Sequence, residues 1–141
     1  MGSEITGTWR LTDYFTVDPG GVERKFWGPD VVGYLMYSAD GYMCVTLMKP
    51  GRGNFAAQDP LMGTKEEKAH AAETYISYGG RYTIEKDKVT HHVEFSLFPN
   101  WVGMDQVRYF SVDGDELRLR STPTKVGGDD VVVQVLWTRV S

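Results

Sequence analysis

Two adjacent histidines in the segment KVTHHVEFSL are the residues best suited to carry chemistry. Alternate side chains of a β-strand point to opposite faces, so His91 shares a face with Val89 and Phe95, whereas His92 lies with Glu94 on the other face. We therefore expect His91 to point inward and His92 to point to solvent, where Glu94 could pair with it. An imidazole that titrates near neutral pH suits a ligand contact, a general acid or base, and a hydrogen-bonded core residue, so these roles stay open.

Asp13 is the second candidate for chemistry. By alternation it shares a face with the apolar residues Trp9, Leu11 and Phe15. A buried carboxylate needs a partner or a proton, so Asp13 could act as a general base or as a ligand anchor with a raised pKa. The alternative is that its side chain reaches solvent or a neighbouring arginine, and we favour this alternative because buried acids are rare.

Aromatic and methionine side chains on other strand-like segments could line a binding cavity, where hydroxyl groups orient a ligand and methionine adapts to irregular shapes. Trp101, in the loop FPNWVG, is expected to cover the mouth of a barrel, with an ion pair between Asp105 and Arg108 holding this loop. Alternation does not decide which face of several strands points inward, and core packing is the alternative role. The candidate ligand-binding residues are His91, Tyr34, Met36, Tyr42, Phe95, Trp101 and Tyr109.

No residue pattern typical of a metal or cofactor site is found in the sequence. Adjacent histidines on a strand diverge, and the third histidine, His70, lies in a helical segment, so the ligand set of a zinc site is not reached. Cys44 has no basic neighbour in sequence that would favour its thiolate, and no phosphate-binding loop or dinucleotide motif is found. We therefore expect neither a metal nor a cofactor.

Charge and composition restrict the partners. A net charge of -4, from 15 Lys+Arg against 19 Asp+Glu, argues against a nucleic-acid partner. No apolar run approaches the roughly 20 residues of a membrane span, and the first residues, MGSEITGTWR, do not resemble an export signal, so no membrane association is expected. A single cysteine excludes an intrachain disulfide and fits a reducing compartment, which makes the cytoplasm the expected location.

The elements that position these residues are expected to be strands. Alternating apolar and polar residues bounded by turn dipeptides recur over almost the whole chain, which is typical of a meandering antiparallel sheet. Asp40-Gly41 joins two such runs, 31–38 and 42–48, and predicts a hairpin. The segments 81–97 and 106–122 predict two further hairpins, the second around Asp113-Gly114.

One segment departs from this pattern. In TKEEKAHAAETYISY, Thr64 and Glu67 form a capping box and Gly79 could occupy the C-terminal left-handed position, which predicts a helix from about 65 to 78. The glycine-rich loop 49–63 before it is long for a compact domain and is expected to act, with the helix, as a lid over the mouth. About nine strands in one domain, 1–141, predict an all-β antiparallel up-and-down barrel, with a sandwich as the alternative.

Specific residues then resemble a known family. Gly7-Thr8-Trp9 at the start of the first strand resembles the G-x-W signature of lipocalins, and Arg139 stands where that superfamily keeps a basic residue stacked on the tryptophan. The segments VGYLMYSADGYMCVTLMKPGR, YISYGGRY and VTHHVEFSLFPNWVGMDQVRYF extend the resemblance to the stand-alone lipocalin-like domains of bacteria and fungi. The resemblance implies that Trp9 and Arg139 close one end of a lipocalin-like barrel of about 8–10 strands.

The resemblance also implies a function, without naming a ligand. A barrel of this kind is wide enough to hold one small molecule, so we expect binding of a small, largely apolar molecule in an interior cavity. The rival is a cofactor-independent isomerase or cyclase acting on a polyketide-like or terpenoid molecule, with His91 or Asp13 as general acid or base. The expected partner is that small molecule, and a homodimer is left open.

Overall fold

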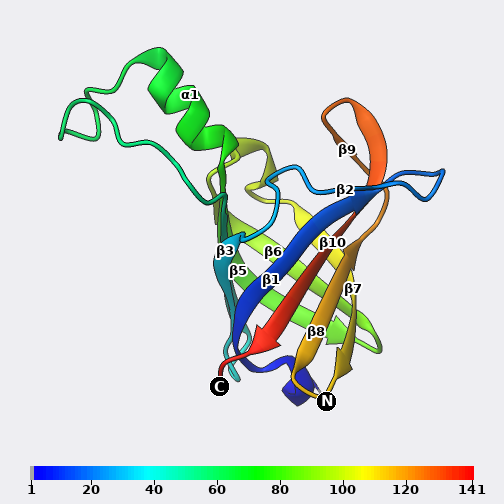
Figure 1. The fold of residues 1–141 in the computed structure, drawn as a ribbon. Coiled ribbons are helices and arrows are strands. Elements are labelled where there is room, and N and C mark those ends of the chain that lie inside the picture. Colours follow the sequence, from blue (N-terminus) through cyan, green and yellow to red (C-terminus); the bar gives the residue numbers. More distant parts are fainter. Residues whose placement is uncertain (1) are drawn as a thin grey trace.

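Eight antiparallel strands close into a barrel in the computed structural model, which describes residues 2–141 (Figure 1). The sheet order is β2-β1-β3-β4-β5-β6-β7-β8-β10-β9, and additional pairing of β1 with β10 closes the barrel. The strands are β1 (Gly7–Val17), β2 (Glu23–Arg24), β3 (Val32–Tyr37), β4 (Tyr42–Met48), β5 (Tyr75–Glu85), β6 (Lys88–Ser96), β7 (Asp105–Asp113), β8 (Glu116–Ser121), β9 (Thr124–Val126) and β10 (Asp129–Arg139). The helical elements are η1 (Gly2–Ile5), α1 (Lys65–Glu73) and η2 (Pro99–Trp101). The predicted lipocalin-like all-β barrel is confirmed.

Tight turns set the register of the meander as predicted. Asp40-Gly41 connects β3 to β4, and Asp113-Gly114 connects β7 to β8, with φ of 99° at Gly41 and 61° at Gly114. These positive φ angles are readily adopted only by glycine, which explains why the turns stand at these positions. The hairpin of β5 and β6 turns at Lys86, which also has a positive φ, of 58°.

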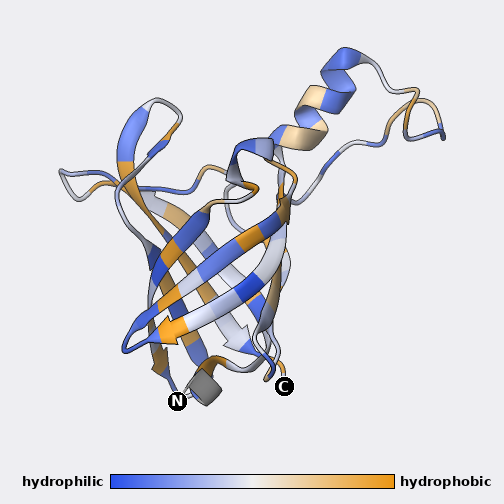
Figure 2. Ribbon diagram, turned by 180° about the vertical axis from the view of Figure 1, so that it is seen from behind, coloured by the Kyte–Doolittle hydropathy of each residue, from blue (hydrophilic) through white to orange (hydrophobic). Residues whose placement is uncertain are grey.

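Buried and exposed residues alternate along barrel strands such as β3 and β8. Figure 2 shows hydrophobic and hydrophilic residues interspersed along the strands. Burying apolar side chains is the main stabilising contribution to a closed sheet. The pairing of β1 with β10 also removes the open edges that an eight-stranded sheet would otherwise have. The fully buried side chains include Ile5, Trp9, Leu35, Tyr37, Val89, His91, Leu117 and Trp137.

The end of the barrel that carries both chain termini is closed by Trp9 and its neighbours (Figure 1). The Trp9 indole N–H donates to the carbonyl oxygen of Ile5 at 2.9 Å, which ties η1 beneath the barrel. The Arg139 guanidinium carbon lies 4.2 Å from the Trp9 ring centroid, and the same group donates to the carbonyl oxygens of Thr6 and Glu4. A cation over an indole face is attractive, so this stacking holds the last strand to the first.

The helix is shorter than predicted and does not cover the barrel. The capping box of Thr64 and Glu67 is present, but α1 ends at Glu73, and Tyr75–Glu85 form β5 instead of a last helical turn. Gly79 therefore lies in a strand, where an added Cβ would meet the Phe95 ring. Figure 1 shows α1 and the preceding loop projecting from the rim, and α1 has no buried residue. Within residues 2–141, no helix combines the length and the apolar character needed to cross a membrane.

Candidate ligand-binding pocket

A pocket of about 630 Å³ is lined by residues from each of the eight strands that close the barrel. It extends from Trp137 in the wall to the loops that carry Trp101 and residues 122–126 at the other end. Tyr78, His91 and Arg108 are among the polar lining residues. The other polar residues of the lining include Lys88, Asp105, Gln106, Ser121, Thr122, Thr124 and Lys125. Most of the wall is apolar, and its members include Leu35, Val45, Leu47, Ile76, Leu119, Val133, Val135 and Trp137.

His91 lies in the pocket wall between two tyrosine hydroxyl groups. It is 1% exposed, and its face of β6 also carries the buried Val89 and Val93. The Tyr37 hydroxyl lies 2.6 Å from His91 Nε2, and the Tyr78 hydroxyl lies 2.7 Å from His91 Nδ1. Both ring nitrogens are therefore hydrogen-bonded, by side chains from β3 and β5.

The surroundings of His91 keep its imidazole neutral. Burial, followed by the electrostatic effects of Arg108 and His92, lowers the pKa of His91 to about 3. Burial also raises the pKa of Tyr78 and, well above its usual value, that of Tyr37, while Arg108 partly opposes both shifts. At neutral pH the three side chains thus form an uncharged hydrogen-bonded group.

Arg108 brings a positive charge into the barrel. It alternates with Phe110, which is buried, so its side chain lies on the inner face of β7. Its guanidinium donates to the carbonyl oxygen of Val107 at 2.9 Å and to Gln106 Oε1 at 3.1 Å. Among residues 2–141, no carboxylate forms an ion pair with it. The expected ion pair with Asp105 is wrong, because residues three apart on a strand lie on opposite faces.

Asp105 instead binds His92 on the outer surface. Asp105 Oδ1 lies 2.9 Å from His92 Nδ1, and the Thr83 hydroxyl lies 3.0 Å from His92 Nε2. The expected pairing of His92 with Glu94 is also wrong, since Glu94 approaches Arg81 at 4.0 Å. The outward direction expected for His92 agrees with this geometry.

Tyr34, Met36 and Tyr42 lie outside the pocket. They stand on the outer face of β3 and β4 and are 46%, 49% and 45% exposed. The structure therefore does not bring these expected ligand contacts to the interior. Both faces of these strands carry large apolar residues, so alternation alone did not predict which face points into the barrel. Tyr109 borders the pocket but is 36% exposed, on the face of β7 opposite Arg108.

Phe95 is displaced from the His91 face by a β-bulge. The register of β5 and β6 pairs Gly79 with Phe95 but Gly80 with Val93, so Glu94 is an extra residue. Such a residue reverses the alternation that follows it. Phe95 is accordingly 55% exposed on the outer face and does not line the pocket.

A second bulge turns Asp13 away from the interior. The register of β1 and β10 shifts between Leu11 and Asp13, so the face that starts with Trp9 is not continued by Asp13. Its carboxylate lies 3.2 Å from Lys25 Nζ, and it also accepts from the backbone N–H of Tyr14. Asp13 thus has a basic partner at the rim, and it does not line the pocket.

Trp101 lies where the loop closes over the pocket. It belongs to η2, and its ring packs edge-on against Tyr78, with centroids 5.7 Å apart, and against Phe98. Trp101 lines the pocket together with Phe98.

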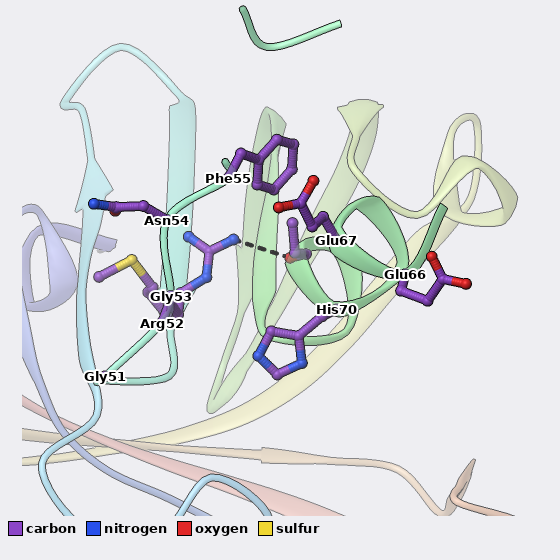
Figure 3. A pocket seen from close by; sticks show the side chains of 10 residues that line it. Gly51, Arg52, Gly53, Asn54, Phe55, Glu66, Glu67 and His70 are labelled. Atoms are coloured by element: carbon purple, nitrogen blue, oxygen red, sulfur yellow. Dashed lines mark hydrogen bonds between the residues drawn. The ribbon is translucent and has the colours of Figure 1, made fainter. Parts of the chain in front are cut away.

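A second pocket, of about 790 Å³, lies outside the barrel between the 49–63 loop and α1 (Figure 3). Arg52 reaches from the loop to the helix, donating to the carbonyl oxygen of Ala71 at 3.1 Å and to the Thr74 hydroxyl at 2.9 Å. Glu67, which accepts from the backbone N–H groups of Thr64 and Ala56, closes the other side. Arg52 and Glu67 thus hold the loop to the helix.

Several important residues in or next to the pocket were not among the candidates. Tyr37 and Tyr78 hydrogen-bond His91, and Trp137 forms part of the wall. Tyr37 lies on the same face of β3 as Leu35, opposite to the face of Tyr34. This alternation was the sequence signal that could have predicted an inward direction for Tyr37. Tyr78 was not a candidate because the sequence predicted a helix up to about residue 78, whereas the residue lies in β5.

Comparisons with known proteins agree with the fold. A family model described as a lipocalin-like domain matches residues 6–140. A curated protein of Aspergillus oryzae, named as a 4'-hydroxy-3'-methoxypropiophenone carrier protein, is 33% identical over 107 residues, which cover 70% of this chain and 96% of that protein.

Proposed function

Because the chain belongs to the lipocalin-like domain family, we propose that its barrel binds and carries one small, largely apolar molecule in the pocket that contains His91. The observation that supports this proposal is a pocket of about 630 Å³ lined by residues of the barrel strands, with more apolar than polar side chains. Small-molecule sites commonly have this size and this composition.

The similar Aspergillus protein supports a carrier role. Its name describes transport of a hydroxylated, methoxylated aryl ketone, a compact aromatic molecule with several oxygen atoms. Aromatic and branched aliphatic side chains such as Trp101, Ile76 and Leu119 would contact a ring of this kind. We infer that the ligand of this chain has a comparable size and an apolar ring or chain.

The chemistry of the candidate bases favours binding over catalysis. A general base works best with a pKa near the working pH, whereas burial lowers the pKa of His91 to about 3. Both of its nitrogens are also occupied by tyrosine hydroxyl groups. Asp13, the other candidate, pairs with Lys25 away from the pocket.

The proposal is tested by fluorescence titration with the neutral probe N-phenyl-1-naphthylamine. We expect saturation near one probe per chain, a change in tryptophan emission because Trp101 and Trp137 line the pocket, and displacement by 4'-hydroxy-3'-methoxypropiophenone or a similar aryl ketone. Native mass spectrometry of the protein purified from its source should show a small molecule bound to it.

A pair of matched variants separates the interior from the outer surface. Val135→Trp fills the pocket, and we expect it to weaken probe binding roughly tenfold or more, while Met36→Trp on the outer face leaves binding unchanged. Val133→Trp, at a half-buried wall position, replaces Val135→Trp if that variant does not fold. Equal binding by the filled and the outer-face variants would exclude the interior pocket as the site.

A further inference from the structure

The two hydrogen bonds of His91 determine which tyrosine has a proton to offer. A neutral imidazole has one N–H and one bare nitrogen, so one tyrosine donates to it and the other accepts from it. The Tyr37 hydroxyl is buried, and within residues 2–141 it contacts only His91 Nε2. If Nε2 carried the hydrogen, the Tyr37 proton would have no acceptor, which is costly for a buried donor. Tyr78 is also buried, at 5% exposure, but it borders the pocket, where a ligand can accept its proton. The tautomer in which Tyr37 donates to Nε2 and Nδ1–H donates to Tyr78 therefore leaves the unused O–H where it can meet a ligand.

Tyr78 is left with a free donor at the pocket. Its oxygen accepts from His91 Nδ1, so its own O–H is not used within the described part of the chain. Tyr78 borders the pocket, whereas Tyr37 does not. A ligand oxygen in the pocket is the acceptor that this hydroxyl lacks.

Two other lining residues of the same pocket carry donor groups that could bind a ligand oxygen. Arg108 places a positive charge on the inner face, with only neutral oxygens as its partners. The buried Trp137 Nε1–H has no acceptor in the part of the chain that the structure describes, and Trp137 forms part of the wall. Asp105, the carboxylate nearest to Arg108 in sequence, also borders the pocket, but its carboxylate pairs with His92 and not with Arg108.

We propose that the pocket selects apolar molecules that carry one anionic oxygen group, such as a carboxylate or an acidic phenol, and that Arg108 and Tyr78 bind this group. The inference rests on the proposed function and adds the chemical class of the ligand. A charge-assisted bond from a guanidinium to an anionic oxygen is stronger than a bond to a neutral oxygen, and the apolar wall excludes the water that would compete. The rest of the ligand contacts the aliphatic and aromatic wall.

Two probes with the same ring skeleton test the proposal on the wild-type protein. 8-Anilino-1-naphthalenesulfonate carries a sulfonate that N-phenyl-1-naphthylamine lacks, and both report binding by fluorescence. We expect the anionic probe to bind at least about tenfold more tightly and to displace the neutral probe one for one. Equal affinities, or an anionic probe that does not displace the neutral one, would overturn the inference. No binding of the neutral probe would refute the proposed function itself.

Arginine variants locate the anion. We expect Arg108→Gln to lower the affinity for the anionic probe about tenfold and to change the affinity for the neutral probe less than about twofold. Arg120→Gln removes the same charge from an exposed position on β8 and is expected to change neither. An equal loss for both probes in Arg108→Gln, or no loss for either, would show that Arg108 has only a structural role.

The tautomer of His91 is tested separately. Nitrogen-15 NMR should show a proton on Nδ1 and none on Nε2. Tyr78→Phe should lower the affinity for the anionic probe several-fold. A proton on Nε2 would remove the Tyr78 donor from the proposal.

Discussion

Acid should destabilise this protein through His91 in a range where most carboxylates are still ionised. In the unfolded chain a histidine titrates near pH 6.5, whereas in the folded protein burial, followed by Arg108 and His92, lowers the pKa of His91 to about 3. Between these values the unfolded chain binds a proton that the folded protein excludes. The contribution of His91 to stability is therefore complete above about pH 6.5 and is lost progressively as the pH falls toward 3.

The magnitude follows from the two pKa values. Lowering the pH from 7 to 5 should reduce the free energy of unfolding by about 2 kcal/mol through this one residue. The loss is nearly the same for any folded-state pKa below about 4, since pH 5 then lies well above it. Tyr37 and Tyr78 stay neutral in this range because burial raises the pKa of each.

Urea denaturation followed by tryptophan fluorescence at pH 7, 6 and 5 measures this effect. Subtracting the pH dependence of a His91→Gln variant removes the contribution of all other groups, and we expect the difference to be about 2 kcal/mol. His92→Gln retains His91 and should keep the part of the pH dependence that comes from His91. If wild type and His91→Gln lose stability in parallel between pH 7 and 5, His91 is not the buried neutral group described above.

Two other expectations concern the two ends of the molecule. Trp9→Ala should destabilise by about 3–5 kcal/mol, because it leaves a cavity, and Arg139→Ala by about 1–2 kcal/mol, because it removes the stacked cation and its hydrogen bonds, with Arg120→Ala as an exposed control in the same denaturation assay. A loss in Arg120→Ala equal to that in Arg139→Ala would contradict this. Backbone amides of 49–63 and of α1, which buries no residue, should exchange with solvent much faster than those of 89–93 in β6. Equal protection in hydrogen-exchange measurements would show that the loop and helix pack against a partner.

Local signals predicted the barrel well. Asp-Gly turns and alternation were sufficient for the β3–β4 and β7–β8 hairpins, because turn geometry fixes register over a few residues. The predicted C-terminal end of the helix, at about residue 78, was wrong, since α1 ends at Glu73. The capping signal at Thr64 marks where the helix begins, whereas the point where it ends depends on the pairing of β5 with β4. That pairing is a tertiary interaction, which propensity does not contain.

Bulges limited the prediction of the pocket. His91 precedes the bulge at Glu94, so its inward direction followed from alternation, whereas Phe95 follows the bulge and points outward. Asp13 lies just beyond the register shift on β1 in the same way. A bulge inserts one residue without an apolar signal of its own, so counting by two fails after it. Tyr37, 54 residues from His91 in sequence, could be placed beside it only by the closed sheet.

The charge inside the barrel has a simple origin in strand alternation. Asp105 and Arg108 lie three residues apart on β7, so a regular strand sends them to opposite faces. The register pairs Asp105 with His92 and Gln106 with His91, so the carboxylate meets a histidine outside while the neutral amide lies on the inner face. Arg108 follows Gln106 on that inner face and retains a charge that no described carboxylate offsets. Placing an unpaired cation in an apolar pocket costs stability. A bound anionic oxygen would recover that cost, and for this reason we assign Arg108 to ligand binding.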